Sequence, residues 1–254
     1  MSLEVQDLSA GYPTKRVLHG VSLPRLTGGS LTALLGPNGS GKSTLLKTLA
    51  GLLPSEGGIR LDGVDLRGLP LVQRMERIAY LPQSLPRGVH LHVVEAVLAA
   101  LRAGGRSRPD DLARAEAVLQ RLGCDALALQ YLDALSGGQR QLVGLAQALV
   151  REPRVLLLDE PLSALDLRHQ LRTMRLLAEL AAERDMAVLI VLHDLNVALR
   201  HCTAAVLLHD GQVAASGEPG DAITSNVLAV VYGVRARVEA CSLGHLQVLV
   251  DEEL

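Results

Sequence analysis

Short runs of apolar residues recur along the chain, each ending in polar or glycine residues and usually followed by a stretch with helical periodicity. Such runs are typical of strands that are buried on both faces of a parallel sheet. We therefore expect strands at residues 31–35, 78–81, 155–158, 187–192 and 204–208. Between residues 166 and 184, apolar side chains at Leu167, Leu171, Met174 and Ala178 have a helical spacing that would cover one face of this sheet. The pattern predicts an α/β fold.

The hydrophobic pattern changes between residues 83 and 135. Residues 93–102 and 112–122 have helical periodicity, and residues 102–109 (RAGGRSRP) form a glycine-rich, basic loop between them. We interpret this part of the chain as a helical lobe, at about residues 84–150, that is inserted into the sheet domain.

A β-like pattern returns near the C-terminus. Residues 209–212 (HDGQ) are a good hairpin turn between Val206 and Val213, and a small β-like tail is expected at about residues 234–254. The length of 254 residues suits one hydrophobic core. We therefore expect a single domain over residues 1–254.

Composition narrows the classes of function. The chain is 48% hydrophobic but has no Phe, no Trp and only 4 Tyr, so its core must be aliphatic and each Tyr calls for an explanation. The formal net charge is -2 and the basic residues are scattered, which gives no indication of a nucleic-acid partner. The 3 cysteines stand far apart without CxxC spacing, which argues against a disulfide framework or a zinc site and suits a reducing cytoplasm.

Neither a leader peptide nor a membrane segment is expected. Residues 1–12 carry Glu4 and Asp7 and lack a basic region and a long apolar run, so they do not resemble a signal peptide. A stretch of about 18 uncharged apolar residues, as a membrane span requires, does not occur. We expect a chain that is soluble by itself.

The strongest chemical signal is residues 36–43 (GPNGSGKS), which fit G-x-x-x-x-G-K-[ST] between a predicted strand and the helical run 44–50. Glycines let the backbone curl so that N–H groups and the helix N-terminus face phosphate oxygens, Lys42 adds a positive charge, and Ser43 can ligate Mg²⁺. An ordinary glycine-rich turn is the alternative, and the flanking strand and helix argue against it. The candidate phosphate-binding residues are Gly36, Pro37, Asn38, Gly39, Ser40, Gly41, Lys42, Ser43 and Thr44.

Residues 155–161 (VLLLDEP) form a buried strand run that ends in two acids. Asp159 and Glu160 would lie at the carboxyl edge of the sheet, where ligand sites of α/β proteins form. There Asp159 would hold Mg²⁺, directly or through water, and Glu160 could polarise an attacking water as a general base. Taken alone, the pair is also compatible with ordinary acids that open the loop after a strand.

Residues 136–139 (SGGQ) have two compatible interpretations. Ser136 at the N-cap and Gln139 three residues later form a capping box for a helix that bears Leu142, Leu145 and Leu149. In addition, Gly137 and Gly138 would be exposed at the positive end of that helix, which makes a second potential phosphate site. Two phosphate sites and one nucleotide suggest that the site is shared between chains.

Gln83 and His193 each follow a predicted strand, so both would emerge at the same sheet edge as Asp159. A lone Gln or His in such a place is more often a satisfied polar residue or a cap. Tyr12 could stack on adenine through its ring, although a single Tyr is more commonly a surface or core residue.

The order of these motifs resembles that of the ATP-binding subunits of ABC transporters along nearly the whole chain. The matching segments, in chain order, are Walker A at residues 36–44, the Q-loop at Gln83, the signature LSGGQ at residues 135–139, Walker B at residues 155–159 followed by the catalytic Glu160, the D-loop at residues 163–166 and the switch His193. The resemblance implies a P-loop NTPase core with a mostly parallel sheet, an antiparallel β portion and an inserted helical lobe. It also implies Mg²⁺-dependent ATP hydrolysis.

The resemblance further implies a head-to-tail dimer with a second copy of the chain, in which residues 36–44 of one copy and residues 136–139 of the other sandwich each ATP. In that family, Gln83 reaches toward Mg²⁺ and the water, His193 contacts the γ-phosphate, and the aromatic residue at the place of Tyr12 stacks on adenine. The implied metal ligands are Ser43, Gln83 and Asp159.

Subunits of this kind are peripheral proteins on the cytoplasmic face of the membrane. Their partners are integral membrane permease subunits and, indirectly, an external substrate-binding protein. Residues 165–170 (LDLRHQ), residues 193–196 (HDLN) with Arg200, and residues 231–234 (VYGV) resemble the branch that imports ferric siderophores, haem and cobalamin. Gln147 and Leu162 depart from the common residues of the family, which puts helix contacts rather than catalysis in doubt.

Other functions are weighed against this interpretation. An ATPase of DNA repair or translation would usually bring a coiled coil, a second cassette or a basic surface, none of which the sequence has. A GTPase or small-molecule kinase would leave the LSGGQ segment unexplained, and Asn-Lys-x-Asp is absent. An exporter often carries its membrane domain on the same chain, so an importer is favoured.

Overall fold

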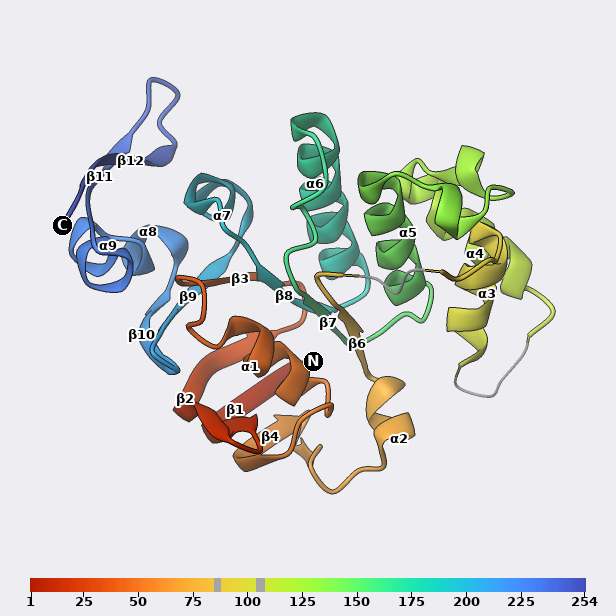
Figure 1. The fold of residues 1–254 in the computed structure, drawn as a ribbon, viewed down its shortest axis with the longest axis horizontal. Helices are drawn as coiled ribbons and strands as arrows, with labels where there is room; N and C mark the ends of the chain where they lie inside the picture. The colour runs from red at the N-terminus through yellow and green to blue at the C-terminus, as the bar shows by residue number, and fades with distance from the viewer. Residues whose placement is uncertain (85–87, 104–107) are drawn as a thin grey trace.

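The computed structural model describes residues 1–84, 88–103 and 108–254 (Figure 1). Residues 104–107 of the predicted glycine-rich loop, and residues 85–87 shortly after Gln83, lie outside the described residues. In the described part of the chain, no helix is both long and apolar enough to cross a membrane.

A six-stranded sheet with the order β10-β9-β3-β8-β7-β6 forms the centre of the molecule. Its strands are β3 (Leu31–Leu35), β6 (Ile78–Leu81), β7 (Val155–Leu158), β8 (Ala187–Val191), β9 (Ala204–His209) and β10 (Gln212–Gly217). Strands β9, β3, β8, β7 and β6 are parallel, and β10 pairs antiparallel with β9 through the turn expected at residues 209–212. The five predicted strands are confirmed, with ends within one residue of the expected ones.

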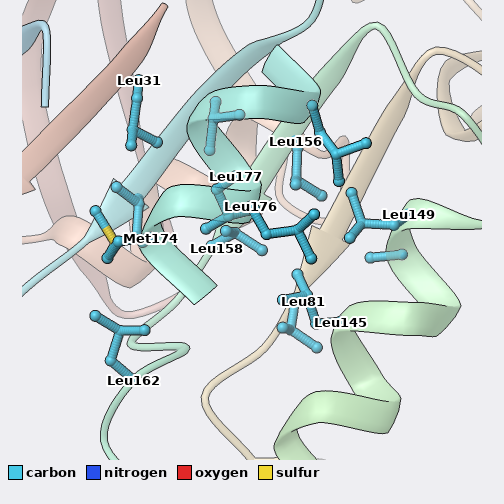
Figure 2. Packing of buried hydrophobic residues seen from close by; sticks show 14 of the residues in the cluster. Leu31, Leu81, Leu145, Leu149, Leu156, Leu158, Leu162, Met174, Leu176 and Leu177 are labelled. Carbon is cyan, nitrogen blue, oxygen red and sulfur yellow. The ribbon is translucent and has the colours of Figure 1, made fainter. Parts of the chain in front are cut away.

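Both faces of this sheet are buried, as the continuous apolar runs predicted. Leu156 and Leu158 of β7 belong to the core on one face, which α5 (Gly137–Leu149) and α6 (Leu167–Glu183) cover. Figure 2 shows Leu145 and Leu149 of α5 packed beside these strand residues, with leucines of α6 close by. The helix is confirmed, but its predicted stripe is wrong: of Leu167, Leu171, Met174 and Ala178 only Met174 is buried, and α6 packs against the sheet through Leu176, Leu177 and Leu180 instead.

The opposite face carries α1 (Lys42–Leu49), which lies between the central sheet and a second, antiparallel sheet (Figure 1). The second sheet has the order β2-β1-β4-β5 and consists of β1 (Ser2–Tyr12), β2 (Lys15–Thr27), β4 (Ser55–Leu61) and β5 (Val64–Asp65). It is the antiparallel β portion that the family resemblance implied. The short helix α2 (Leu71–Met75) leads from this sheet into β6.

Helices occupy most of the chain between β6 and β7: α3 (Val93–Arg102), α4 (Asp111–Leu122), two short 3₁₀ turns and α5. They lie side by side at one end of the molecule (Figure 1). Gln147, one of the two departures from the family pattern, donates a hydrogen bond from Nε2 to the Ala96 carbonyl oxygen over 3.2 Å and so joins α5 to α3.

The C-terminal elements lie at the other end of the molecule (Figure 1). They are α7 (Leu195–His201), α8 (Pro219–Ala222), α9 (Ser225–Tyr232) and a two-stranded antiparallel sheet of β11 (Val234–Ala240) and β12 (Leu246–Glu253). Ala236 and Val248 of this small sheet are buried in the same core as Ala198 of α7.

Candidate active site

The loop between β3 and α1 is shaped by its glycines. Gly36, Gly39 and Gly41 have φ angles of 139°, 82° and 106°, in the region that favours glycine. A Cβ atom on Gly36 would lie 2.1 Å from the carbonyl oxygen of Leu208, so a larger residue would push the loop away from β9. The backbone therefore curls tightly into the N-terminus of α1, an arrangement that can bind phosphate.

Lys42 is held inside this loop. Its side chain is buried, and Nζ donates hydrogen bonds to the carbonyl oxygens of Gly36 over 2.7 Å and Pro37 over 2.9 Å. Burial lowers the pKa of Lys42, while the charges of Glu160 and Asp159 raise it. The loop thus places an ammonium group next to the two acids that follow β7.

Asp159 is buried at the end of β7 and receives two hydrogen bonds. Ser43 Oγ donates to Oδ1 over 3.1 Å, and the Tyr80 hydroxyl donates to Oδ2 over 3.2 Å. Burial raises the pKa of Asp159, and the two hydrogen bonds lower it. Burial and the charge of Asp159 also raise the pKa of Tyr80, so its hydroxyl stays protonated and able to donate.

Glu160 adopts a φ of 51°, a backbone conformation that is uncommon for a residue other than glycine and is found at functional sites. Its two carboxylate oxygens are both engaged: Gln83 Nε2 donates to Oε2 over 2.7 Å, and His193 Nε2 lies 2.8 Å from Oε1. The structure thus brings together Gln83, His193 and the acid pair, as expected from their places after parallel strands. These two contacts fix the orientation of the Glu160 carboxylate.

The capping box of residues 136–139 is confirmed. Ser136 Oγ accepts a hydrogen bond from the Gln139 N–H over 3.3 Å, and Gln139 Oε1 accepts one from the Ser136 N–H over 2.9 Å. These residues line a cavity together with Ala164, Leu165, Asp166 and His169. Of the described residues that line it, none belongs to the loop at 36–44, so the two candidate phosphate sites of one chain are separate.

The D-loop, residues 163–166, packs closely against the start of α5. A Cβ on Gly138 would lie 2.8 Å from the Ala164 carbonyl oxygen, whereas one on Gly137 would meet only the Ala164 Cβ at 3.8 Å. We expect Gly138→Ala to lower the melting temperature of the nucleotide-free protein by roughly 2–12 °C, because overpacking costs about 1–3 kcal/mol. Gly137→Ala is the matched control, and circular dichroism gives the measurement. Equal melting temperatures would show that the D-loop backbone moves aside.

Tyr12 lies at the turn between β1 and β2, with 44% of its surface exposed. It lines a cavity that is bounded by residues 9–16 and 53–56. A ring exposed in this way can stack on a planar base.

Tyr80 and Tyr232 also contact the candidate site, although the sequence analysis did not predict them as site residues. Besides Tyr80, which binds Asp159, Tyr232 accepts a hydrogen bond at its hydroxyl from the Gly36 N–H over 2.8 Å. The scarcity of aromatic residues pointed to both, and Tyr232 also lies in the segment 231–234 (VYGV) that resembles the importer branch. Nothing local in the sequence connects either tyrosine with its partner.

The sequence is similar to a known protein family and to several of its members. The sequence model of the family described as "ABC transporter" matches residues 18–163. The hemin import ATP-binding protein HmuV of Bordetella avium is 40% identical, with 94% of each chain covered. The ferric enterobactin transport ATP-binding protein FepC of Escherichia coli K12 is 35% identical, with 93% of this chain and 89% of the relative covered.

Solved structures agree with the sequence relatives. A protein described as a metal-chelate type ABC transporter, in an inward-facing conformation, superposes with a TM-score of 0.82 at 27% identity, covering 100% of this chain and 98% of that one. A dimeric bacterial ABC transporter cassette superposes with a TM-score of 0.78 at 27% identity, covering 85% of this chain and 98% of that one.

Proposed function

Because the chain belongs to the ABC transporter family, we propose that it binds and hydrolyses ATP to drive an importer of an iron chelate, either haem or a ferric siderophore. The observation that carries the proposal is the arrangement around Glu160. Its carboxylate is held by Gln83 and His193 and follows directly after Asp159, which binds Ser43 at the end of the phosphate loop.

We assign Ser43, Asp159 and Gln83 as the residues that would hold Mg²⁺. The Ser43 and Asp159 oxygens, 3.1 Å apart, are the hard donors that Mg²⁺ prefers, and Gln83 offers an amide oxygen. Within the described residues, no group of three or more His, Cys, Asp or Glu side chains could hold a metal, so the phosphates of ATP would supply further ligands. When bound, Mg²⁺ would neutralise phosphate charge.

Glu160 takes the role of general base in this proposal. It would accept a proton from the water that attacks the γ-phosphorus, while the bond from that phosphorus to the β,γ-bridging oxygen breaks and leaves ADP and phosphate. Gln83 and His193 orient the carboxylate, and His193 can donate to the γ-phosphate. Lys42 would exchange its loop carbonyls for phosphate oxygens.

A second copy of the chain completes each site. The phosphate loop and residues 136–139 are separate in one chain, and one of the structural relatives is a dimer. In a head-to-tail pair, Ser136, Gly137, Gly138 and Gln139 of one copy would cover the ATP that residues 36–44 of the other bind. Tyr12 would stack on the adenine ring.

The proposed location is the cytoplasmic face of the membrane, where the chain would be a peripheral protein bound to integral permease subunits. The helical lobe at about residues 84–150 and the loop that begins at Gln83 would transmit closure of the dimer to the permease. An external binding protein would deliver the chelate to that permease. The names of the relatives support haem or a ferric siderophore as cargo.

Deletion of the gene in its native host tests this function. We expect uptake of labelled haem or of labelled ferric siderophore to be lost, and to be restored by the wild-type gene but not by Lys42→Ala. The Lys42 variant separates the need for ATP binding from the mere presence of the subunit. Unchanged uptake of both chelates would contradict the assignment of an iron chelate as the cargo and leave the ATPase assignment to be tested on the purified protein.

A further inference from the structure

The phosphate loop is contacted by a residue from the far C-terminal part of the chain. Tyr232, the last residue of α9, accepts the Gly36 N–H at its hydroxyl oxygen over 2.8 Å. The carbonyl oxygen of the same Gly36 accepts a hydrogen bond from Lys42 Nζ over 2.7 Å. Both backbone polar groups of the first loop residue are therefore fixed, one by Lys42 and the other by Tyr232.

A second contact joins the C-terminal sheet to the segment that carries His193. Asn196 Oδ1 accepts the Val248 N–H over 2.7 Å, and Asn196 Nδ2 lies 3.5 Å from the Val248 carbonyl oxygen. The side-chain amide thus pairs with β12 as a neighbouring strand would. Asn196 follows His193 by three residues, and its own N–H donates to Asp194 over 2.8 Å at the start of α7.

Both contacts are made by one small unit, residues 225–254, which we name the C-terminal brace. Gly233 directly follows Tyr232, and its carbonyl oxygen accepts the N–H of Leu254, so the chain end returns to the end of α9. Leu228 of α9 and Val248 of β12 are buried in the same core cluster. Because α9 and β12 are joined in this way, the Tyr232 contact with Gly36 and the Val248 contact with Asn196 are held at fixed positions relative to each other.

We propose that the C-terminal brace positions the ATP site, with Tyr232 fixing the Gly36 peptide and Asn196 fixing the helix that follows His193. The inference rests on the proposed function, in which residues 36–44 bind phosphate and His193 acts at the γ-phosphate. Binding of phosphate by backbone N–H groups requires a loop that is ordered before the ligand arrives. A phenylalanine at position 232 could pack as Tyr232 does, but it could not accept the Gly36 N–H.

Tyr232→Phe and Asn196→Ala are expected to change different kinetic constants of ATP hydrolysis, the first KM and the second kcat. Tyr232→Phe should raise the KM for ATP by about threefold to tenfold, the value of one lost hydrogen bond, with kcat within about twofold of wild type. Asn196→Ala should lower kcat by at least about threefold with KM nearly unchanged, because it displaces the His193 segment rather than the loop. Purified full-length protein, steady-state ATP hydrolysis and melting curves give the measurements.

Tyr131→Phe is the matched control for the loss of a hydroxyl, because the Tyr131 ring stacks on His90 and His92, neither of which is a site residue. It should leave both constants at wild-type values. A Tyr232→Phe protein with the wild-type KM would overturn the inference. The inference would also fail if kcat fell equally in both variants and in proportion to the fraction of protein that is unfolded. ATP binding to the wild type is measured directly before any variant is compared, and a wild type that binds no ATP would overturn the proposed function itself.

Discussion

Glu160→Gln is expected to bind ATP as tightly as the wild type and to hydrolyse it more slowly by a factor on the order of 10² or more. The amide keeps the size of the carboxylate but cannot take a proton from water. Its oxygen can still accept from Gln83, and its NH₂ group can donate to a neutral His193, so the geometry is retained. Single-turnover hydrolysis and a separate measurement of ATP affinity test the two halves of the expectation.

The same variant should accumulate as an ATP-bound dimer, because the step that would open it is blocked. Size-exclusion chromatography with light scattering, with and without ATP, measures this. Glu183→Gln is the matched control, since Glu183 is an exposed carboxylate that binds Arg121 on the surface. Hydrolysis by Glu160→Gln at the wild-type rate would remove Glu160 from the role of base, and a monomer in ATP would contradict the shared site.

Much of the central fold could be predicted because its strands are buried on both faces. A strand covered on both sides has no polar face, so it appears in the sequence as an unbroken apolar run with sharp ends. The long strands β1 and β2 lack this signal. Their pairing contains several register shifts, and Asp7 within β1 has a φ of 47°, so the alternation of apolar and polar residues is interrupted.

The edge of the sheet explains why Gln83, Glu160 and His193 could be expected together. Parallel strands end at the same edge, so residues that directly follow such strands are expected at one edge of the sheet. That Gln83 and His193 both reach Glu160 depends further on β6 and β8 lying on either side of β7. Tyr80 could not be found in this way, because it lies within β6 rather than after its end, and its bond to Asp159 depends on β6 lying next to β7. Tyr232 is separated from Gly36 by 196 residues, and only the packing of α9 brings the two together.

Lys42→Ala is expected to weaken ATP binding by a factor on the order of 10 to 10², which corresponds to about 1.4–2.7 kcal/mol. The Lys42 ammonium is buried, and it is the cation that the loop holds next to Asp159 and Glu160, so its loss leaves phosphate charge without a partner. The loss also frees the carbonyl oxygens of Gly36 and Pro37. Isothermal titration calorimetry with ATP and Mg²⁺ measures the change directly.

Lys42→Met separates charge from shape in this prediction. Methionine fills the loop with a chain of similar length, so weakening as large as that in Lys42→Ala would assign the effect to the missing charge. Recovery of affinity in the methionine variant would instead show that the alanine variant collapses the loop, a change that the melting temperature of the nucleotide-free protein would also register. If both variants bind ATP as the wild type does, residues 36–44 do not bind its phosphates through Lys42, and the assignment of the site fails at its strongest motif.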